Sequence, residues 1–206
     1  MKPSKNTVTW AARLLLLLAP FISSEGRAAP FSPSTLPGQS IYQSDSRWDT
    51  TEGKKILLSE LKGAPVVVAM LYTGCQAACP MTISDLKRIE SGLDPEARMQ
   101  VRFAIFSFDS VKDTPSNLKV FRVKHNLEPS RWSFFHGSPE NVQELAALLG
   151  IRFKRLETGD FDHSNVITVL DTQGVIVHRQ IGLRIDPQET LGVIKGLTER
   201  VEIEKK

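Results

Sequence analysis

Cys75 and Cys79 are the only cysteines in this 206-residue chain, and three residues separate them. An apolar run at residues 66–71 leads into the pair, and Pro80 follows directly. The two sulfur atoms therefore lie at an expected strand-to-helix turn, where they can be oxidised to a disulfide or can bind a soft metal ion. A disulfide across so short a loop would stabilise the fold little, which favours a reactive or metal-binding pair.

The expected helix start also bears on the acidity of the thiols. A proline such as Pro80 is typical of the first helical turn, which puts Cys79 near the N-cap and Cys75 in the loop before it. Unpaired N–H groups and the positive end of the helix dipole stabilise a nearby thiolate, so we expect a lowered thiol pKa at this turn. The thiolate is the form that attacks a disulfide and the form that binds a metal.

Two thiolates make an incomplete metal site, and imidazole is a suitable third ligand. Of the four histidines, His163 is the best placed, because it stands in a polar loop just before the apolar run at residues 166–170. Loop residues are accessible, and Asp160 or Asp162 could orient the imidazole ring. The other three histidines fall late in a helix, at a strand end and within a hairpin strand, and we interpret them as structural: His125, His136 and His178. Sequence position alone leaves the role of His163 open.

The rest of the chain alternates between strand and helix patterns. Strands are expected at residues 66–71, 101–108, 132–135, 166–170 and 175–180, and helices from Pro80, from Pro115, at residues 139–149 and at residues 187–201. Asp171 to Gly174 forms a hairpin turn signal between the last two strands. This order predicts an α/β fold with a central mixed sheet, helices on both faces and an antiparallel hairpin at one side. A thioredoxin-like fold fits this pattern, as do other α/β sheets.

The N-terminal part is expected to lie outside this domain. Residues 1–28 combine a basic start with an apolar run at residues 14–22 that is short for a membrane span, so we interpret them as a signal peptide or an uncleaved N-terminal anchor. Residues 29–39 are rich in Pro, Ser and Gly and are expected to form a flexible linker, which leaves residues 40–206 as the domain. The protein is therefore expected to be periplasmic or otherwise exported.

The charge of the expected mature domain argues against one class of partner. The formal net charge of +3 arises in residues 1–28, which hold four basic residues and one acidic residue. The remaining chain carries 22 basic and 22 acidic residues and is neutral. Nucleic-acid binding is therefore not expected.

Several short motifs together resemble those of the Sco/SenC family of copper-binding proteins, over about residues 41–201. They are Tyr-Thr-Gly-Cys at 72–75 with Cys-Pro at 79–80, Ser-Phe-Asp at 107–109, Asp-Thr-Pro at 113–115, Asp-His-Ser at 162–164 and Asp-x-x-Gly at 171–174. The resemblance implies an exported domain with a thioredoxin-like fold. It makes Cys75, Cys79 and His163 the copper ligands.

The resemblance also implies a function and partners. The function is delivery of copper to the binuclear copper centre of a haem–copper oxidase, or reduction of the cysteines of that centre. The implied partners are the copper-centre subunit of cytochrome oxidase or another exported cuproprotein, and a protein that donates copper. Contact with a membrane is expected only through the N-terminal segment.

The chemistry of the implied ligands agrees with copper as the cofactor or cargo. Two thiolates and one imidazole suit Cu(I), and a fourth ligand from water or a nearby oxygen would let them hold Cu(II). Zn²⁺ competes for the same ligands, because two Cys and one His with an open position also form a zinc geometry. Under the Irving–Williams order copper binds a given site more tightly than zinc.

Two enzymatic alternatives use the same sulfur pair. In a thiol–disulfide reductase, Cys75 would attack a client disulfide and Cys79 would resolve the mixed disulfide. In that case replacement of His163 would barely affect disulfide exchange. A peroxidase is a third alternative, and it ranks low because no arginine is evident near Cys75 in the sequence.

Overall fold

The computed structural model describes Met1, residues 36–75 and residues 78–204. The expected leader at residues 1–28 and residues 29–35 of the expected linker lie outside the described residues, apart from Met1, as do Gln76 and Ala77. The elements of the domain in chain order are η1 Ile41–Gln43, β1 Arg47–Thr50, β2 Lys55–Leu57, η2 Leu58–Leu61, β3 Val66–Leu71, α1 Ala78–Gly92, α2 Pro95–Gln100, β4 Arg102–Ser107, α3 Pro115–Lys124, β5 Trp132–His136, α4 Pro139–Leu149, β6 Phe153–Arg155, β7 Phe161–His163, β8 Val166–Leu170, β9 Ile176–Ile181 and α5 Gln188–Glu204.

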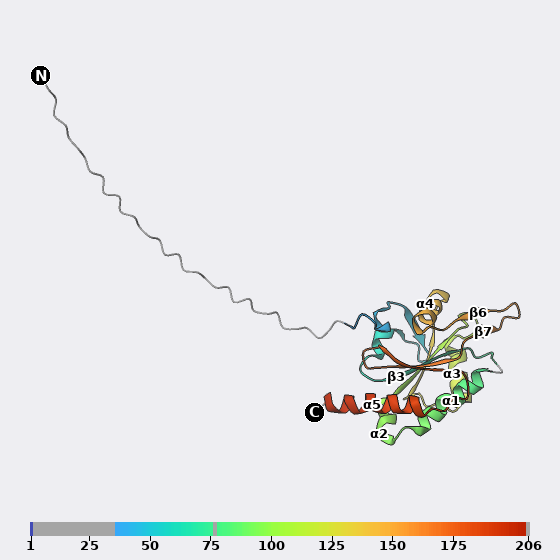
Figure 1. Ribbon diagram of the computed structural model, residues 1–206. Coiled ribbons are helices and arrows are strands. Elements are labelled where there is room, and N and C mark those ends of the chain that lie inside the picture. Colours follow the sequence, from blue (N-terminus) through green and yellow to red (C-terminus); the bar gives the residue numbers. More distant parts are fainter. Residues whose placement is uncertain (2–35, 76–77, 205–206) are drawn as a thin grey trace. The chain divides into compact units, whose positions relative to one another are not determined.

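Among the described residues, the main sheet has seven strands in the order β2-β1-β5-β4-β3-β8-β9. β3 pairs in parallel with β4, and β4 in parallel with β5, whereas β3 pairs antiparallel with β8. Every residue of β3 and of β8 is buried, so both faces of the sheet are covered at its centre. Figure 1 shows α1, α2 and α5 on one side of the sheet and α4 on the other. The predicted mixed α/β sheet with helices on both faces is confirmed.

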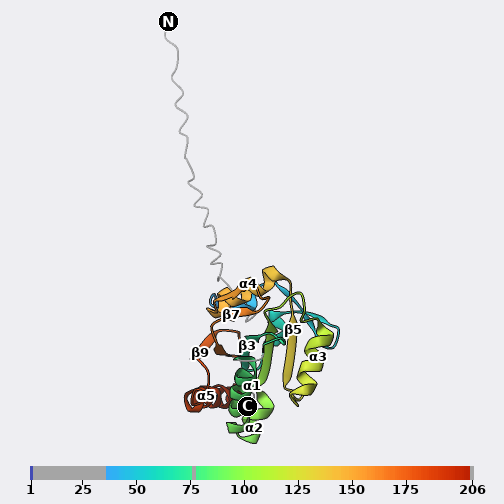
Figure 2. The ribbon, with the colours of Figure 1, turned by 90° about the vertical axis from the view of Figure 1, so that its right-hand side faces the viewer.

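Aromatic pairs fill the core between the parallel strands. The rings of Phe103 and Trp132 stack across β4 and β5 with centroids 4.5 Å apart, and Phe106 stacks on Phe135 at 4.6 Å. These rings are almost fully buried. Figure 2 shows α3 beside β5. Cross-strand aromatic pairs of this kind hold the register of neighbouring strands.

Local signals account for the helix ends that the sequence predicts. Ser138 caps α4 by accepting a hydrogen bond from the N–H of Asn141, and Pro139 occupies the first turn. Gly150 ends the helix with φ of +71°, a left-handed conformation that costs glycine least. α3 begins in the same way, with Thr114 as N-cap before Pro115.

Three parts of the fold are not expected from the sequence. The antiparallel β1–β2 hairpin extends the sheet beyond β5, and the short helix α2 follows α1. The third is a separate two-stranded sheet of β6 and β7, in which Phe153 pairs with His163. The prediction of a polar loop around His163 is therefore wrong, because His163 is the last residue of the short strand β7. Three-residue strands that are half exposed carry too little hydrophobic pattern to be recognised.

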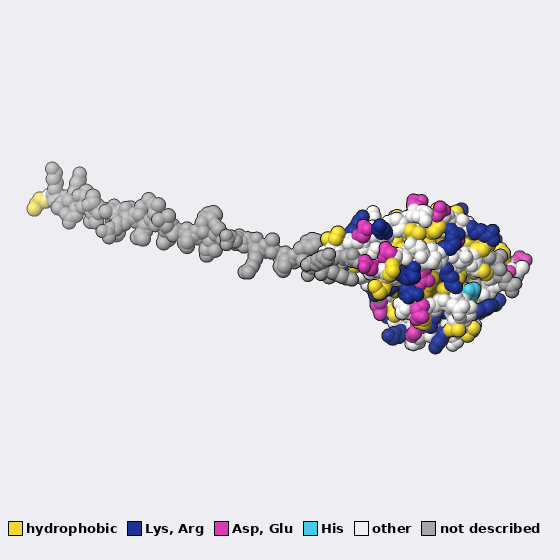
Figure 3. All heavy atoms as spheres, turned by 90° about the horizontal axis from the view of Figure 1, so that it is seen from below, with side chains coloured by type: hydrophobic (Ala, Val, Ile, Leu, Met, Phe, Trp, Pro, Cys, Tyr) yellow, Lys and Arg dark blue, Asp and Glu magenta, His cyan; other side chains and the backbone are white. Residues whose placement is uncertain are grey.

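The surface of the domain mixes both signs of charge. Figure 3 shows Lys and Arg side chains interspersed with Asp and Glu side chains over one face of the domain. This agrees with the equal numbers of basic and acidic residues outside residues 1–28. Within the described part of the chain, no helix is long and apolar enough to cross a membrane.

Candidate metal centre

The two cysteines follow the buried central strand β3, but they differ in exposure. Cys75 is half-buried, and its N–H donates to the carbonyl of Tyr72 over 3.3 Å in the turn after the strand. Cys79 is the second residue of α1 and is fully buried. No disulfide joins the two sulfur atoms. The predicted strand-to-helix turn is confirmed, with Cys79 inside the first helical turn.

The backbone at the helix start contacts the more exposed sulfur. The N–H of Cys79 donates to Sγ of Cys75 over 3.3 Å. Burial raises the pKa of the Cys79 thiol well above its ordinary value, and the Cys75 side chain raises it further. The expected lowering of the thiol pKa at this turn is therefore wrong for Cys79, because loss of hydration outweighs the field of the helix N-terminus.

A buried carboxylate braces the segment just before Cys75. Asp113 accepts a hydrogen bond from the N–H of Thr73 over 2.9 Å, a second from the Thr73 hydroxyl, and a third from the hydroxyl of Ser107 over 2.5 Å. Its exposed fraction is 1%. Nδ1 of His136 lies 3.0 Å from the carbonyl oxygen of Asp113 and adds to this brace. The sequence reveals Asp113 only as part of a motif, because its partner Thr73 lies 40 residues away.

His163 reaches the same region from β7. Its half-buried ring packs against Phe108 with centroids 4.9 Å apart. Its Nδ1 lies 3.3 Å from the carbonyl oxygen of Ser164, so a proton on Nδ1 would be donated to that oxygen. The lone pair of Nε2 is then available for a ligand. The expectation that Asp160 or Asp162 orients the ring is not met, since the described contact of Nδ1 is the Ser164 carbonyl.

Tyr72 links the cysteine turn to the histidine strand. Its hydroxyl donates to Oδ1 of Asp160 over 3.4 Å and accepts the N–H of Phe161 over 3.4 Å. Its ring packs edge-on against Phe161, with centroids 5.0 Å apart, and lies 6.4 Å from the ring of His163. Burial and the neighbouring side chains of Cys75 and Asp160 raise the pKa of Tyr72 to about 12. The hydroxyl therefore keeps its proton at neutral pH.

Cys75 and His163 line one open cavity of about 580 Å³. Its walls come from the β3 end, the α1 start and the segment around β7: Tyr72, Gly74, Cys75, Ala78, Asp160, Phe161, Asp162, His163 and Asn165. Cys79 is adjacent to Cys75 but is not part of the wall. In the described ranges 36–75 and 78–204, no three His, Cys, Asp or Glu side chains are already arranged to hold a metal ion. The structure thus brings two of the three predicted ligands to a shared cavity.

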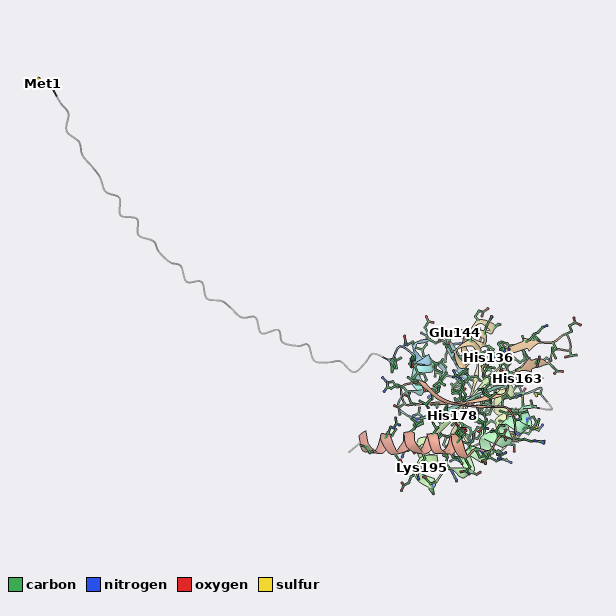
Figure 4. All side chains as sticks on the ribbon, in the orientation of Figure 1. Met1, His136, Glu144, His163, His178 and Lys195 are labelled. Atoms are coloured by element: carbon green, nitrogen blue, oxygen red, sulfur yellow. The ribbon has the colours of Figure 1, made fainter. Side chains whose placement is uncertain are left out.

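Two of the other histidines, His125 and His178, lie away from the cavity in contacts of their own. Nε2 of His178 lies 3.0 Å from the hydroxyl of Thr190 on α5, and the ring of His125 packs on Phe121 with centroids 4.3 Å apart. In Figure 4, His163 lies at the β7 end of the domain, whereas His178 lies toward α5. Their structural interpretation agrees with these contacts.

Comparison with known proteins identifies relatives of the whole domain. The family described as SCO1/SenC matches residues 36–199. A candidate copper-binding protein of Stutzerimonas stutzeri is 30% identical over 133 residues, which are 61% of this chain and 63% of that protein. The chain thus spans less than two thirds of the length of that relative.

Solved structures share the fold. A SCO1/SenC family lipoprotein from Bacillus anthracis str. Ames has a TM-score of 0.67 at 25% identity, covering 73% of this chain and 91% of that chain. Bradyrhizobium japonicum ScoI with copper bound has a TM-score of 0.60 at 23% identity, covering 74% and 96%. BsSco, described as a Sco-family cytochrome c oxidase assembly protein with a disulfide switch, has a TM-score of 0.65 at 24% identity, covering 74% and 90%.

These likenesses confirm the predicted thioredoxin-like fold. The family match extends from the first described residue of the domain to within α5, so it includes the cysteine turn, Asp113 and the β6–β7 hairpin. The chain belongs to the SCO1/SenC family.

Proposed function

We propose that this protein is a copper metallochaperone whose cargo is bound by Cys75, Cys79 and His163. The observation that carries the proposal is the shared cavity: Cys75 and His163 line one open space, and the N–H of Cys79 donates to Sγ of Cys75. Soft thiolates and an imidazole are the donors that Cu(I) prefers. The copper-binding description of the Stutzerimonas stutzeri relative and the copper bound in Bradyrhizobium japonicum ScoI support the choice of metal.

The differing exposure of the ligands suggests how the cargo enters. Cys75 and His163 border the cavity, so an arriving ion meets them first. Cys79 is buried, and its raised pKa keeps it protonated, so its proton must leave as the sulfur joins the ion. Copper binding should therefore release protons and require a small movement of β7.

The client that we propose is the binuclear copper centre of a haem–copper oxidase, or another exported cuproprotein, with a separate protein as copper donor. The description of BsSco as an oxidase assembly protein supports this client. We further propose that residues 1–28 export the domain or anchor it, that residues 29–39 form the linker, and that the domain works in the periplasm or an equivalent compartment. The Bacillus anthracis relative, a lipoprotein, is consistent with such an anchored arrangement.

Titration of the reduced protein with Cu(I), against a chromogenic Cu(I) chelator, tests the ligand set. Cys75→Ser, Cys79→Ser and His163→Ala should each weaken binding, the cysteine changes by at least about 100-fold, since a lost ligand costs more than a lost outer contact. His125→Ala is the matched control, because His125 packs on Phe121 away from the cavity. Unchanged affinity in both Cys75→Ser and His163→Ala would reject the site. Parallel titration with Zn²⁺ tests the metal, and preference for zinc would reject copper as the cargo.

A second function, thiol–disulfide reductase, is favoured by the asymmetry of the two cysteines. Cys75 is open to the cavity and could attack a client disulfide, which forms a mixed disulfide and releases one client thiolate. Attack by Cys79 on Sγ of Cys75 would then release the second client thiolate. The client gains two electrons, and Cys75 and Cys79 become a disulfide.

The two functions make different demands on His163. Disulfide exchange with a model disulfide should survive in His163→Ala but not in either cysteine variant, whereas copper binding needs all three residues. A reduction potential far more oxidising than that of client cysteines would exclude the reductase.

A further inference from the structure

Tyr72 occupies the junction between the two parts that would hold the cargo. Its main chain lies in the turn that carries Cys75, and its carbonyl oxygen accepts a hydrogen bond from the N–H of Cys75. Its hydroxyl contacts Asp160 and the N–H of Phe161, which is the first residue of β7. One side chain thus spans from the central sheet to the strand that carries His163.

The need for such a link follows from the sheet topology. β6 and β7 pair with each other and belong to a separate sheet, so the main sheet restrains His163 through the short connection to β8 and not by strand pairing. The ring of Phe108 supports His163 by apolar contact, which restrains distance but not direction. The hydrogen bonds of the Tyr72 hydroxyl are directional, so they restrain how far β7 can slide along the end of β3.

We propose that Tyr72 is a positioning residue that sets the separation of Cys75 and His163 through its hydroxyl group. The positioning of β7 is argued from the contacts of the Tyr72 hydroxyl in the metal-free protein. The effect of this positioning on copper binding rests on the proposed function. The ring should matter less than the hydroxyl, because a phenyl group can keep the packing on Phe161 but makes none of the hydroxyl's contacts with Asp160, the Phe161 N–H and the Cys75 side chain.

The chain offers a matched pair of variants. Tyr72→Phe removes a hydroxyl that bridges two elements. Tyr42→Phe removes the hydroxyl of the other tyrosine, which is buried and has no hydrogen-bond partner among the described residues. Asp160→Ala removes the acceptor at an exposed position and leaves both tyrosines intact.

The metal-free arm measures the positioning directly. In Tyr72→Phe, amide hydrogen exchange at Phe161 should accelerate by about 3- to 10-fold, the effect of losing one ordinary hydrogen bond. The ring nitrogen signals of His163, assigned with His163→Ala, should shift as well. Asp160→Ala should shift the same signals to a smaller extent, and Tyr42→Phe should leave them unchanged. Unchanged Phe161 exchange and His163 signals in Tyr72→Phe would overturn the proposal.

The copper arm uses Cu(I) affinity and the Cu(II) spectra of the loaded protein. In Tyr72→Phe, affinity should fall about 3- to 10-fold, and the thiolate absorption band and the nitrogen coupling from His163 should change. Wild-type spectra and affinity in this variant would overturn the role in the copper site. Failure of the proposed function would look different. Replacement of Cys75 or His163 would then leave copper binding unchanged, while hydrogen exchange at Phe161 in the metal-free protein would still test the role of Tyr72.

Discussion

The cysteine turn and the β6–β7 hairpin face the same cavity but are supported in different ways. The turn continues β3, which is buried between β4 and β8, and the Asp113 carboxylate holds it by hydrogen bonds to Thr73. The hairpin consists of two three-residue strands that pair only with each other, and most of its side chains are exposed or half exposed. The proposed centre therefore has a fixed sulfur half and a more adjustable imidazole half.

This difference agrees with the finding that, in the described residues, no three candidate ligand side chains already form a metal site. A metal site that is complete without its ion would hold the cargo tightly and release it slowly. A site with one adjustable half can close around an ion and open again at small cost. The comparison thus fits a protein that passes on its metal.

Hydrogen exchange gives the sharpest test of the comparison. Amide protons of β3 should exchange at least about 100-fold more slowly than those of β6 and β7, because β3 opens only with the whole domain. Exchange measured residue by residue in the metal-free, reduced protein checks this. Equal protection in the two regions would remove the distinction between a fixed and an adjustable half.

Removal of the Asp113 carboxylate should loosen the fixed half. Asp113→Ala leaves the N–H and hydroxyl of Thr73 and the hydroxyl of Ser107 without their shared acceptor. We expect the free energy of unfolding to fall by about 3 kcal/mol, since hydrogen bonds to a buried charge are among the stronger ones. Urea denaturation measures this loss. A change below about 1 kcal/mol would mean that Asp113 does not brace the turn.

Because the Cys79 thiol is buried, we expect the free energy of unfolding to fall at alkaline pH. Cys79 has a raised pKa in the folded state, so the folded protein keeps a proton that the unfolded chain loses above about pH 8.5. Its contribution to stability is complete below that pH and is lost as the pH rises, by up to about 1.4 kcal/mol per pH unit. Denaturation of the reduced, metal-free protein between pH 7 and 10 measures the slope. Cys79→Ser should flatten it, and a slope that persists in this variant would assign it to other groups.

The smallest effect is expected in the adjustable half. Asp162 is exposed on β7, and no described hydrogen bond joins its carboxylate to His163. Asp162→Ala should change the free energy of unfolding by less than about 0.5 kcal/mol, as is usual for surface positions. Cu(I) affinity should stay within about twofold. A tenfold loss of affinity would restore the sequence-based expectation that Asp162 orients the ring.

Much of the fold is predictable because its signals are local. The apolar run of β3, the proline at the start of α4 and Gly150 at its end are each sufficient to place an element. The cysteine turn follows from the same reasoning, since a buried strand that meets a proline-marked helix leaves a short loop between them.

The rest of the candidate site depends on contacts between distant residues. Asp113 and Thr73 are 40 residues apart. Tyr72 and Asp160 are 88 residues apart. No local sequence pattern therefore predicts either contact. The acidity of Cys79 could not be foreseen because it depends on how completely α1 is packed, a property of the whole fold. The assignment of Cys75, Cys79 and His163 as ligands stays a prediction.

The different exposure of the proposed ligands implies an order of events if the protein hands on an ion. Cys79 is buried and does not line the cavity, so an acceptor sulfur that enters the cavity would meet Cys75 and His163 first. Exchange of the cargo would then begin at those two bonds, and the bond to Cys79 would be the last to break. Since burial raises the pKa of the Cys79 thiol, that sulfur would take up a proton in the final step.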